Sequence, residues 1–510
     1  MRLIQFSKKL LFVPVAAGAL LCSCMEATEG ESEKNTLTVD PESSFTYNIN
    51  GNVNFFDSTE QEDSEYDEKE FKNEITIQFN GDKEPTYEYN GVSKDEVTIT
   101  SYEEKGKAHL IIRAEKKVNY ILKGTSESGS LLIFSEKKFK LTLDNLNLSN
   151  DNGLPAICSQ TKKRCFIETK GTATIKDAEG DNGYSLGSAY EKEVKIGDEI
   201  EYYDAKGAIF SEGELIFCGD ENSTLNIEGR NMHAICSDDY VRVKSGKINI
   251  TKANKDGIHT NDAVLIYGGK LNIKNVGKLF NLHSNQYPNP YSSRKMNGIQ
   301  CEKGYIVVKG GEIDITSLGY GIYANCDDFN KSDIMTKKSF IYIDGGKINI
   351  ETTEDEGHGI SAKNHIIIKN GEINIRAKGA EAKGIEADSN KKSATGDELE
   401  YGNITLAGGT VNLFCTDKVV DPAGKFNIVG GTLNAIGGSE FTKDQVFDGS
   451  KPYAVASFAD VKVGETIKIN GKDVGIVATA LSTAKVVVIG SGEKVPVEIG
   501  AKKADAVVAK

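Results

Sequence analysis

The sequence contains no tryptophan, 9 prolines and 9 cysteines among its 510 residues. The absence of tryptophan argues against a flat, cellulose-type binding platform, which usually relies on indole rings. No Cys-x-x-Cys or His-Glu-x-x-His motif is present, and the seven cysteines after residue 24 are an odd number, which argues against a disulfide framework and indicates small buried thiols. The formal net charge of −14 argues against nucleic acid and anionic membrane surfaces as partners.

The first 23 residues predict a lipoprotein signal peptide that the mature chain loses. Two lysines precede an apolar run at residues 10–21, which is too short to span a membrane. The run ends in Leu-Cys-Ser-Cys at residues 21–24, which resembles a bacterial lipobox. We therefore expect a lipid on Cys24, with Cys22 as the weaker alternative. The membrane partner would be reached through this anchor alone, which predicts an outer-membrane lipoprotein, either exposed at the cell surface or facing the periplasm.

Glycine is abundant, with 52 residues, and much of it recurs in pairs between short alternating strands. Gly246 and Gly269, Gly346 and Gly371, and other such turns lie about two dozen residues apart, which is typical of one turn of a stacked repeat. The sequence therefore predicts an all-β fold, a right-handed parallel β-helix (solenoid). We assign residues 24–74 to an acidic tether and the start of an N-terminal β cap, residues 75–440 to the repeats, and residues 441–510 to a small C-terminal β cap. Within the tether, residues 57–74 predict a solvated acidic loop or a disordered insert.

An alignment of the repeats on one isoleucine predicts which side chains share a column. The aligned residues are Ile157, Ile209, Ile235, Ile258, Ile299, Ile322, Ile360 and Ile385. Two positions later, where a strand points inward again, every residue is small: Ser159, Ser211, Ser237, Thr260, Cys301, Ala324, Ala362 and Ala387. One position after the isoleucine, the outward column is mixed and partly aromatic: Cys158, Phe210, Cys236, His259, Gln300, Tyr323, Ser361 and Glu386.

These repeats resemble a known family. Asp256-Gly257-Ile258 and the Gly-Gly-Lys-Ile-Asn-Ile turn at residues 345–350 are similar to the serial "DGI…GG.I.I" turns of the bacterial carbohydrate-binding β-helix family founded on a clostridial extracellular protein. The resemblance covers roughly residues 75–440. It implies binding of plant cell-wall glycans, including acidic pectic chains, with calcium in the structure. The sequence departs from the pattern because the Asp256 position holds Asn297, Tyr320, His358 and Lys383 in other repeats.

Calcium is the cofactor that the sequence suggests. The third position after the aligned isoleucine is rich in oxygen ligands, and stacked carboxylates repel one another unless a divalent cation lies between them. The candidate ligands are Asp238, Asp239, Asp256, Asp262 and Asp327. The alternative interpretation is a set of hydrated corners in which Asn and Asp favour the turn.

The outward column is the candidate polysaccharide-binding face. Phe210 and Tyr323 could stack on sugar rings, while His259, Gln300 and Glu386 could hydrogen-bond to hydroxyl groups. Tyr287 and Tyr291 lie in a predicted loop that would flank this face. Ordinary exposed side chains on a strand surface are the alternative.

The function predicted from the sequence is non-catalytic binding of a polysaccharide by a surface-anchored lipoprotein. A lyase needs a lysine or arginine base beside a calcium site, and no arginine falls in the outward column. A hydrolase needs two carboxylates across a cleft, which stacking could bring together from distant residues. A polysaccharide lyase or hydrolase and a structural adhesin therefore remain the alternatives.

Overall fold

The computed structural model describes residues 59–67, 69–102, 106–150, 155–178, 206–274, 296–325, 339–388, 402–489 and 494–509, together with strands at 35–39, 43–47, 53–57, 191–196 and 199–204. The signal peptide, Cys24, Tyr287, Tyr291 and Asp327 lie outside the described residues. Within the described part, no helix combines the length and the apolar character needed to cross a membrane.

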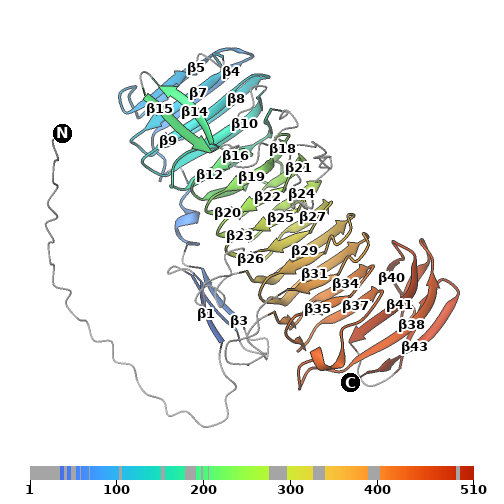
Figure 1. The fold of residues 1–510 in the computed structure, drawn as a ribbon. Coiled ribbons are helices and arrows are strands. Elements are labelled where there is room, and N and C mark those ends of the chain that lie inside the picture. Colours follow the sequence, from blue (N-terminus) through green and yellow to red (C-terminus); the bar gives the residue numbers. More distant parts are fainter. Residues whose placement is uncertain are drawn as a thin grey trace, which may run out of the picture.

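One set of strands forms a 12-stranded sheet along the length of the molecule (Figure 1). Each of its strands after β7 pairs in parallel with the equivalent strand of the next repeat, and the aligned isoleucines face one another in these pairs. The strands are β6 (Val97–Ser101), β7 (His109–Ala114), β9 (Ser130–Ser135), β11 (Ile157–Ser159), β16 (Gly207–Ser211), β19 (His233–Ser237), β22 (Ile258–Thr260), β25 (Ile299–Cys301), β28 (Ile322–Ala324), β30 (Ile360–Ala362), β32 (Ile385–Ala387) and β35 (Val420–Pro422).

The strands that follow in each repeat form two further rows, again with parallel pairing from one repeat to the next. The second row contains β8 (Asn119–Ser126), β10 (Phe139–Ser149), β12 (Cys165–Lys170), β17 (Leu215–Gly219), β20 (Tyr240–Val243), β23 (Ala263–Ile266), β26 (Tyr305–Val308), β33 (Ile404–Leu406) and β36 (Phe426–Ile428). The third row contains β13 (Thr172–Lys176), β18 (Thr224–Gly229), β21 (Lys247–Ala253), β24 (Lys270–Lys274), β27 (Glu312–Ser317), β34 (Thr410–Cys415) and β37 (Thr432–Gly437). Three long strands pair with strands of both rows: β10, β29 (Ile341–Thr352) and β31 (Ile366–Ala377).

This connectivity corrects the fold class predicted from the sequence. The all-β class is confirmed for the described residues, but the predicted open solenoid, a right-handed parallel β-helix, is wrong, because the second and third rows and the strands at both ends form one sheet that closes as a barrel. The reason lies at the glycine turns. Strands β29 and β31 continue through Gly346 and Gly371, where positive φ angles let the backbone bend without ending the strand, and so join two rows that the sequence pattern separates.

The core follows the predicted columns. The register pairs the outward residues repeat by repeat as aligned, from Cys158↔Phe210 to Ser361↔Glu386, which confirms the predicted column. The aligned isoleucines and the small inward residues are buried, and the six described cysteines after residue 24 are buried free thiols. Apolar side chains of all three rows thereby enclose a continuous interior.

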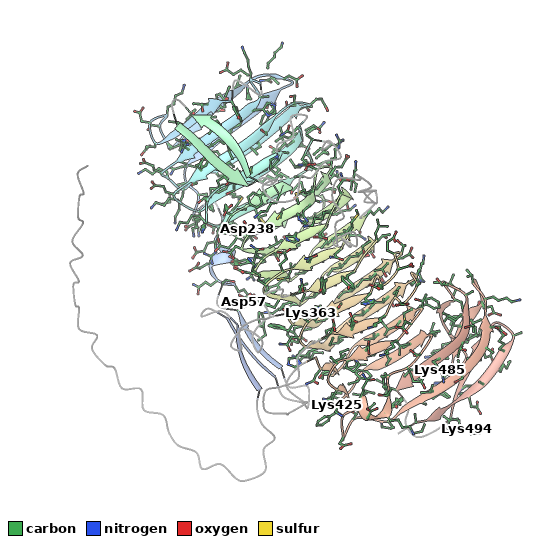
Figure 2. The ribbon with its side chains drawn as sticks, viewed as in Figure 1. Asp57, Asp238, Lys363, Lys425, Lys485 and Lys494 are labelled. Atoms are coloured by element: carbon green, nitrogen blue, oxygen red, sulfur yellow. The ribbon has the colours of Figure 1, made fainter. Side chains whose placement is uncertain are left out.

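Antiparallel strands cover both ends of the stack. At the N-terminal end, β4 (Glu74–Asn80) pairs with β5 (Lys83–Asn90) and with β8. At the other end, β37 pairs with β41 (Leu481–Ile489), which belongs with β38 (Tyr453–Val461), β39 (Thr466–Ile469), β40 (Lys472–Ile476), β42 (Val495–Ile499) and β43 (Lys502–Val508). Lys425, Lys485 and Lys494 mark this end in Figure 2.

Residues 57, 59–67 and 69–71, which we call the strap, lie along the second row and include a short 3-10 helix at Glu62–Ser64. Arg242 of β20 is 1% exposed and pairs with Asp57 at 2.8 Å and with Asp63 at 2.5 Å. Asp63 also accepts hydrogen bonds from Arg164 and from the hydroxyl of Tyr240, each at 2.9 Å. The interpretation of residues 57–74 as a solvated loop is therefore wrong for Asp57 and Asp63, which are buried and pair with Arg242, a role that sequence proximity cannot reveal.

Aromatic contacts hold the two ends of the strap. Phe71 packs edge-on against Phe166 of β12, with ring centroids 5.7 Å apart, and also lies against Ile216. Just before the strap, Phe55 of β3 (Val53–Asp57) contacts Tyr305 of β26 at 6.0 Å between centroids. Figure 2 shows Asp57 beside the flank of the stack, where these contacts place it.

Candidate functional site

Two outward positions of each repeat form what we call the polar strip, which runs along the 12-stranded sheet from β19 to β35. The first position lies two residues before the aligned residue, and the second lies one residue after it. The first-position residues are His233, Asp256, Asn297, Tyr320, His358, Lys383 and Lys418. The second-position residues are Cys236, His259, Gln300, Tyr323, Ser361, Glu386 and Asp421.

Four of the seven first-position side chains accept a hydrogen bond from the backbone of the next repeat. The Asp256 N–H donates to His233 Nδ1 at 3.2 Å, the Asn297 N–H to Asp256 Oδ1 at 2.9 Å, and the Tyr320 N–H to Asn297 Oδ1 at 2.8 Å. His358 Nδ1 accepts the same bond from Lys383 at 3.1 Å. This requirement explains why Asp, Asn and His replace one another here, since each supplies an acceptor to an amide that would otherwise be buried without a partner.

The two positions of one repeat also contact each other. Asn297 donates to Gln300 Oε1 at 2.6 Å, and the rings of Tyr320 and Tyr323 lie 4.5 Å apart at 41°. Further along, the Lys383 ammonium lies 2.5 Å from Glu386. Five of the seven repeats therefore present a pre-positioned pair of side chains, and successive repeats are one strand spacing, about 4.8 Å, apart.

His259 holds a buried charge at the N-terminal part of the strip. Its Nδ1 lies 2.9 Å from Asp256 Oδ2 and its Nε2 lies 3.3 Å from Glu302 Oε1. Burial opposes protonation of His259, but the hydrogen bonds to Asp256 and Glu302 outweigh it and raise the histidine pKa. The hydrogen bond from His259 lowers the pKa of Glu302 to about 2. We assign an imidazolium between two carboxylates.

His233 stacks on His259 with ring centroids 4.1 Å apart at 28°, and together with Asp256 they are the described group whose spacing could hold a metal ion. The geometry of these three side chains does not suit a metal ion. Nearly stacked rings cannot both direct an in-plane lone pair at the same ion, and His233 Nδ1 and Asp256 Oδ1 already accept backbone hydrogen bonds. Burial lowers the pKa of His233 to about 3, which leaves it neutral with its proton on Nε2.

The four described calcium candidates, Asp238, Asp239, Asp256 and Asp262, do not meet at one point. Asp238 pairs with Lys206 at 2.7 Å, and Asp256 is committed to the two histidines. Asp239 and Asp262 lie in consecutive repeats; burial and the nearby carboxylates of Glu214 and Asp262 raise the pKa of Asp239 to about 7. Among the described members of the predicted set, Asp239 is the one whose pKa neighbouring carboxylates raise, and carboxylate oxygens are ligands that suit a hard cation.

The predicted sugar-binding residues fall into two groups. Gln300 and Tyr323 are half-buried on the strip, with side chains reaching the surface. Phe210 is fully buried in a cluster with Leu132, Cys158 and Cys236, so it offers no ring face to a ligand, and its placement on an exposed face is wrong. Residue type could not reveal this burial, because it depends on what covers the N-terminal end of the sheet.

Glu386 and His259 are buried at 7% and 6% and act mainly within the strip. Glu386 accepts a hydrogen bond from Ser361 at 3.0 Å and lies 3.2 Å from His358 Nε2. The residues that sequence reasoning missed are His233, Asn297, Tyr320, His358 and Lys383. The signal for them was present in the alignment, at the position where they replace the motif aspartate.

With this geometry in place, comparison with known proteins assigns the family. A family model described as "Carbohydrate-binding domain-containing protein" matches residues 106–328 and 292–444. The chain belongs to this family. The two matched regions together contain the polar strip. Membership of the family therefore assigns carbohydrate binding to these repeats.

Two further comparisons accompany the family assignment. The structure of the polysaccharide lyase-like protein from C. thermocellum, determined as a gadolinium derivative, is 16% identical, with a TM-score of 0.37; the alignment covers 62% of this chain and 95% of that chain. No curated protein matches the chain.

Proposed function

We propose that this carbohydrate-binding family member binds a polysaccharide along the polar strip, without cleaving it. The observation that carries the proposal is the centre of the strip, where Gln300, Tyr320 and Tyr323 are half-buried side by side. Sugar rings present apolar C–H faces and a rim of hydroxyl groups. Tyrosine rings bind the first, and amide and phenol groups bind the second.

The ends of the strip support its centre. On one side of the centre, Asp256, His259 and Glu302 form ion pairs with one another. On the other side, Lys383 forms an ion pair with Glu386. Because these groups are already partnered, they fix the backbone on both sides of the tyrosines and add little net charge. A rigid platform of this kind binds with a smaller entropy cost than a mobile one.

A glycan array that covers plant cell-wall polysaccharides tests the proposal. The double variant Tyr320→Ala/Tyr323→Ala should bind the recognised glycan about tenfold more weakly, which corresponds to about 1.4 kcal/mol. Tyr89→Ala, a half-buried tyrosine on β5, is the matched control and should bind as wild type does. Equal affinity of all three proteins for every bound glycan would place the site elsewhere.

Binding without cleavage is the second part of the proposal. A lyase needs a basic side chain that can take a proton, and Lys383 is the strip lysine nearest to several acids. Burial would lower its pKa, but hydrogen bonds to Asp421 and Glu386 outweigh it and raise the pKa, so Lys383 keeps its proton. Incubation with polygalacturonate should yield no unsaturated product by ultraviolet absorbance; steady growth of that absorbance would instead establish a lyase.

Calcium assistance is proposed at Asp239 and Asp262. A divalent cation there would relieve the repulsion that raises the pKa of Asp239. After dialysis against calcium, the wild-type chain should retain about one ion by elemental analysis, and Asp239→Asn/Asp262→Asn should lose it. Retention of the ion by the double variant, or no ion in the wild type, removes calcium from the proposal.

The lipid anchor is proposed at Cys24, on the strength of the lipobox-like residues 21–24. Cells fed a labelled fatty acid should label the wild-type chain in the outer-membrane fraction, and Cys24→Ala should abolish the label. Protease treatment of intact cells then distinguishes surface exposure from the periplasmic orientation. Label that persists in Cys24→Ala and disappears in Cys22→Ala would move the anchor to Cys22.

A further inference from the structure

The third row carries a ladder of asparagine side chains that the strip does not use. Asn349 donates to Asp314 Oδ1 at 2.7 Å, Asn374 to Asn349 at 2.9 Å, Asn412 to Asn374 at 2.8 Å and Asn434 to Asn412 at 2.9 Å. A carboxamide has two N–H groups and two acceptor lone pairs, so a ladder bond in each direction leaves polar capacity over. The ladder therefore presents amides at about 4.8 Å intervals along the stack.

A cleft of about 350 Å³ lies over this ladder, where the C-terminal strands approach the third row. Its floor is the asparagine ladder with Arg376, and its side wall is Ile467, Val474 and Ile476 from β39 and β40. The volume falls within the range of small-molecule and glycan pockets, about 300–1,000 Å³. The cleft spans strands β27 to β37, so it runs along the stack and suits an extended chain.

Ile476 is the feature of this cleft that folding does not explain. It is 51% exposed and is one of three large hydrophobic residues, with Val463 and Val507, that the described part of the chain leaves exposed. Val463 and Val507 do not line the cleft, whereas Ile476 stands at its wall opposite the amides. An amide floor and an aliphatic wall match the two surfaces of a sugar ring, the hydroxyl rim and the C–H face.

The charged side chains around the cleft indicate which class of glycan it can bind. Asp314 and Glu351 are its acids and Arg376 is its base, and Lys378 pairs with Glu351 at 2.6 Å. These charges balance, so neither a strongly acidic nor a basic ligand gains from the site. The spacing of the amides is close to the length of one sugar unit in an extended chain. We propose that the cleft is a second site, which binds a neutral, linear oligosaccharide parallel to the stack.

The ligand class rests on the proposed function, but the location does not, and the experiment separates the two. Full-length chain carrying Tyr320→Ala/Tyr323→Ala, which disables the strip, is titrated calorimetrically with xylohexaose, cellohexaose and mannohexaose. Binding of one of these should persist in this background. Adding Ile476→Glu, which places a charge on the aliphatic wall, should weaken that binding at least tenfold. Adding Val463→Glu, a matched exposed valine on the same end of the molecule at 64% exposure, should leave it unchanged.

Each outcome bears on the cleft. Loss with Ile476→Glu and retention with Val463→Glu establish the site, provided that both variants unfold at the same temperature as their background. Binding that Ile476→Glu leaves unchanged overturns it. If the strip-disabled chain binds none of the three hexasaccharides, the cleft proposal also fails, while the glycan array decides the strip independently.

Discussion

Asp256 has two structural roles in this fold: it accepts a backbone hydrogen bond and it is a counter-ion for His259. Its carboxylate accepts the backbone N–H of Asn297 in the next repeat and lies against His259 in its own. Burial would raise its pKa, but the charged His259 beside it outweighs burial and lowers it. A motif aspartate that suggested a calcium ligand is thus a structural acceptor and a counter-ion, and the Asn and His substitutions in other repeats preserve the first of these roles.

His259 makes stability depend on pH in a defined direction. Its pKa is raised in the folded chain above the unfolded value of about 6.5, so its contribution is fully present below that pH and is lost as pH rises through the folded pKa. The free energy of unfolding in urea should therefore fall from about pH 6.5 upward, relative to His259→Gln. Parallel pH profiles for the two proteins would show that His259 is not charged in the folded state.

The ion pairs that Arg242 makes with Asp57 and Asp63 hold the strap against the second row. Arg242→Ala leaves Asp57 and Asp63 buried without their shared cation, and we expect a loss of about 3–5 kcal/mol in the free energy of unfolding. Arg376→Ala, an exposed arginine on the third row, should change it by less than about 0.5 kcal/mol. Urea unfolding measures both. Equal small effects would mean that the strap does not depend on its ion pairs with Arg242.

At the scale of elements, the glycine turns decide how rows connect. Gly346 has a φ of +85°, and a Cβ there would meet the carbonyl oxygen of Gly311 at 2.9 Å. The backbone of one turn therefore packs directly on the turn of the previous repeat. This packing keeps β29 continuous through the corner and joins the second row to the third.

Glycine-to-alanine substitutions distinguish the stability cost of backbone strain from the cost of disrupted packing at such a turn. Gly464 has nearly the same φ, +84°, but a Cβ at that position would meet nothing within 4 Å. Gly464→Ala should cost about 1 kcal/mol from the backbone alone, and Gly346→Ala about 1–3 kcal/mol more, because neighbouring backbone must move. Urea unfolding checks the difference, and equal costs would show that the turns do not pack on one another.

For the whole molecule, the ends matter as much as the repeats. Strand β41 pairs with β37 from Asn434↔Val488 to Gly437↔Lys485 and covers the last edge of the stack. An uncovered edge of this kind offers unpaired backbone groups to another chain. We therefore expect the chain to stay a single stack only while both ends are covered.

A chain that ends after Gly438 tests this role. It should associate into dimers or larger species by size exclusion with light scattering, because the β37 edge is then free to pair. Adding Ile436→Lys, which places a charge on the outward side of that edge, should reduce the association. A monomeric truncated chain would show that the C-terminal strands are not needed to keep the β37 edge from pairing.

The sequence by itself determined the columns. Strand alternation and the aligned isoleucines predict which residues point inward and which share a repeat position, because the period of a strand is two and stacked repeats must match. His259, Gln300, Tyr323 and Glu386 are therefore found on one column, as the register confirms.

Only the tertiary structure decided the rest. It buried Phe210, drew Asp57 and Asp63 of the strap onto Arg242, closed the second and third rows into one sheet, and placed Ile476 over the asparagine ladder. Each of these depends on segments that are far apart in the chain, and their contacts are set by packing and burial, which local residue patterns do not encode.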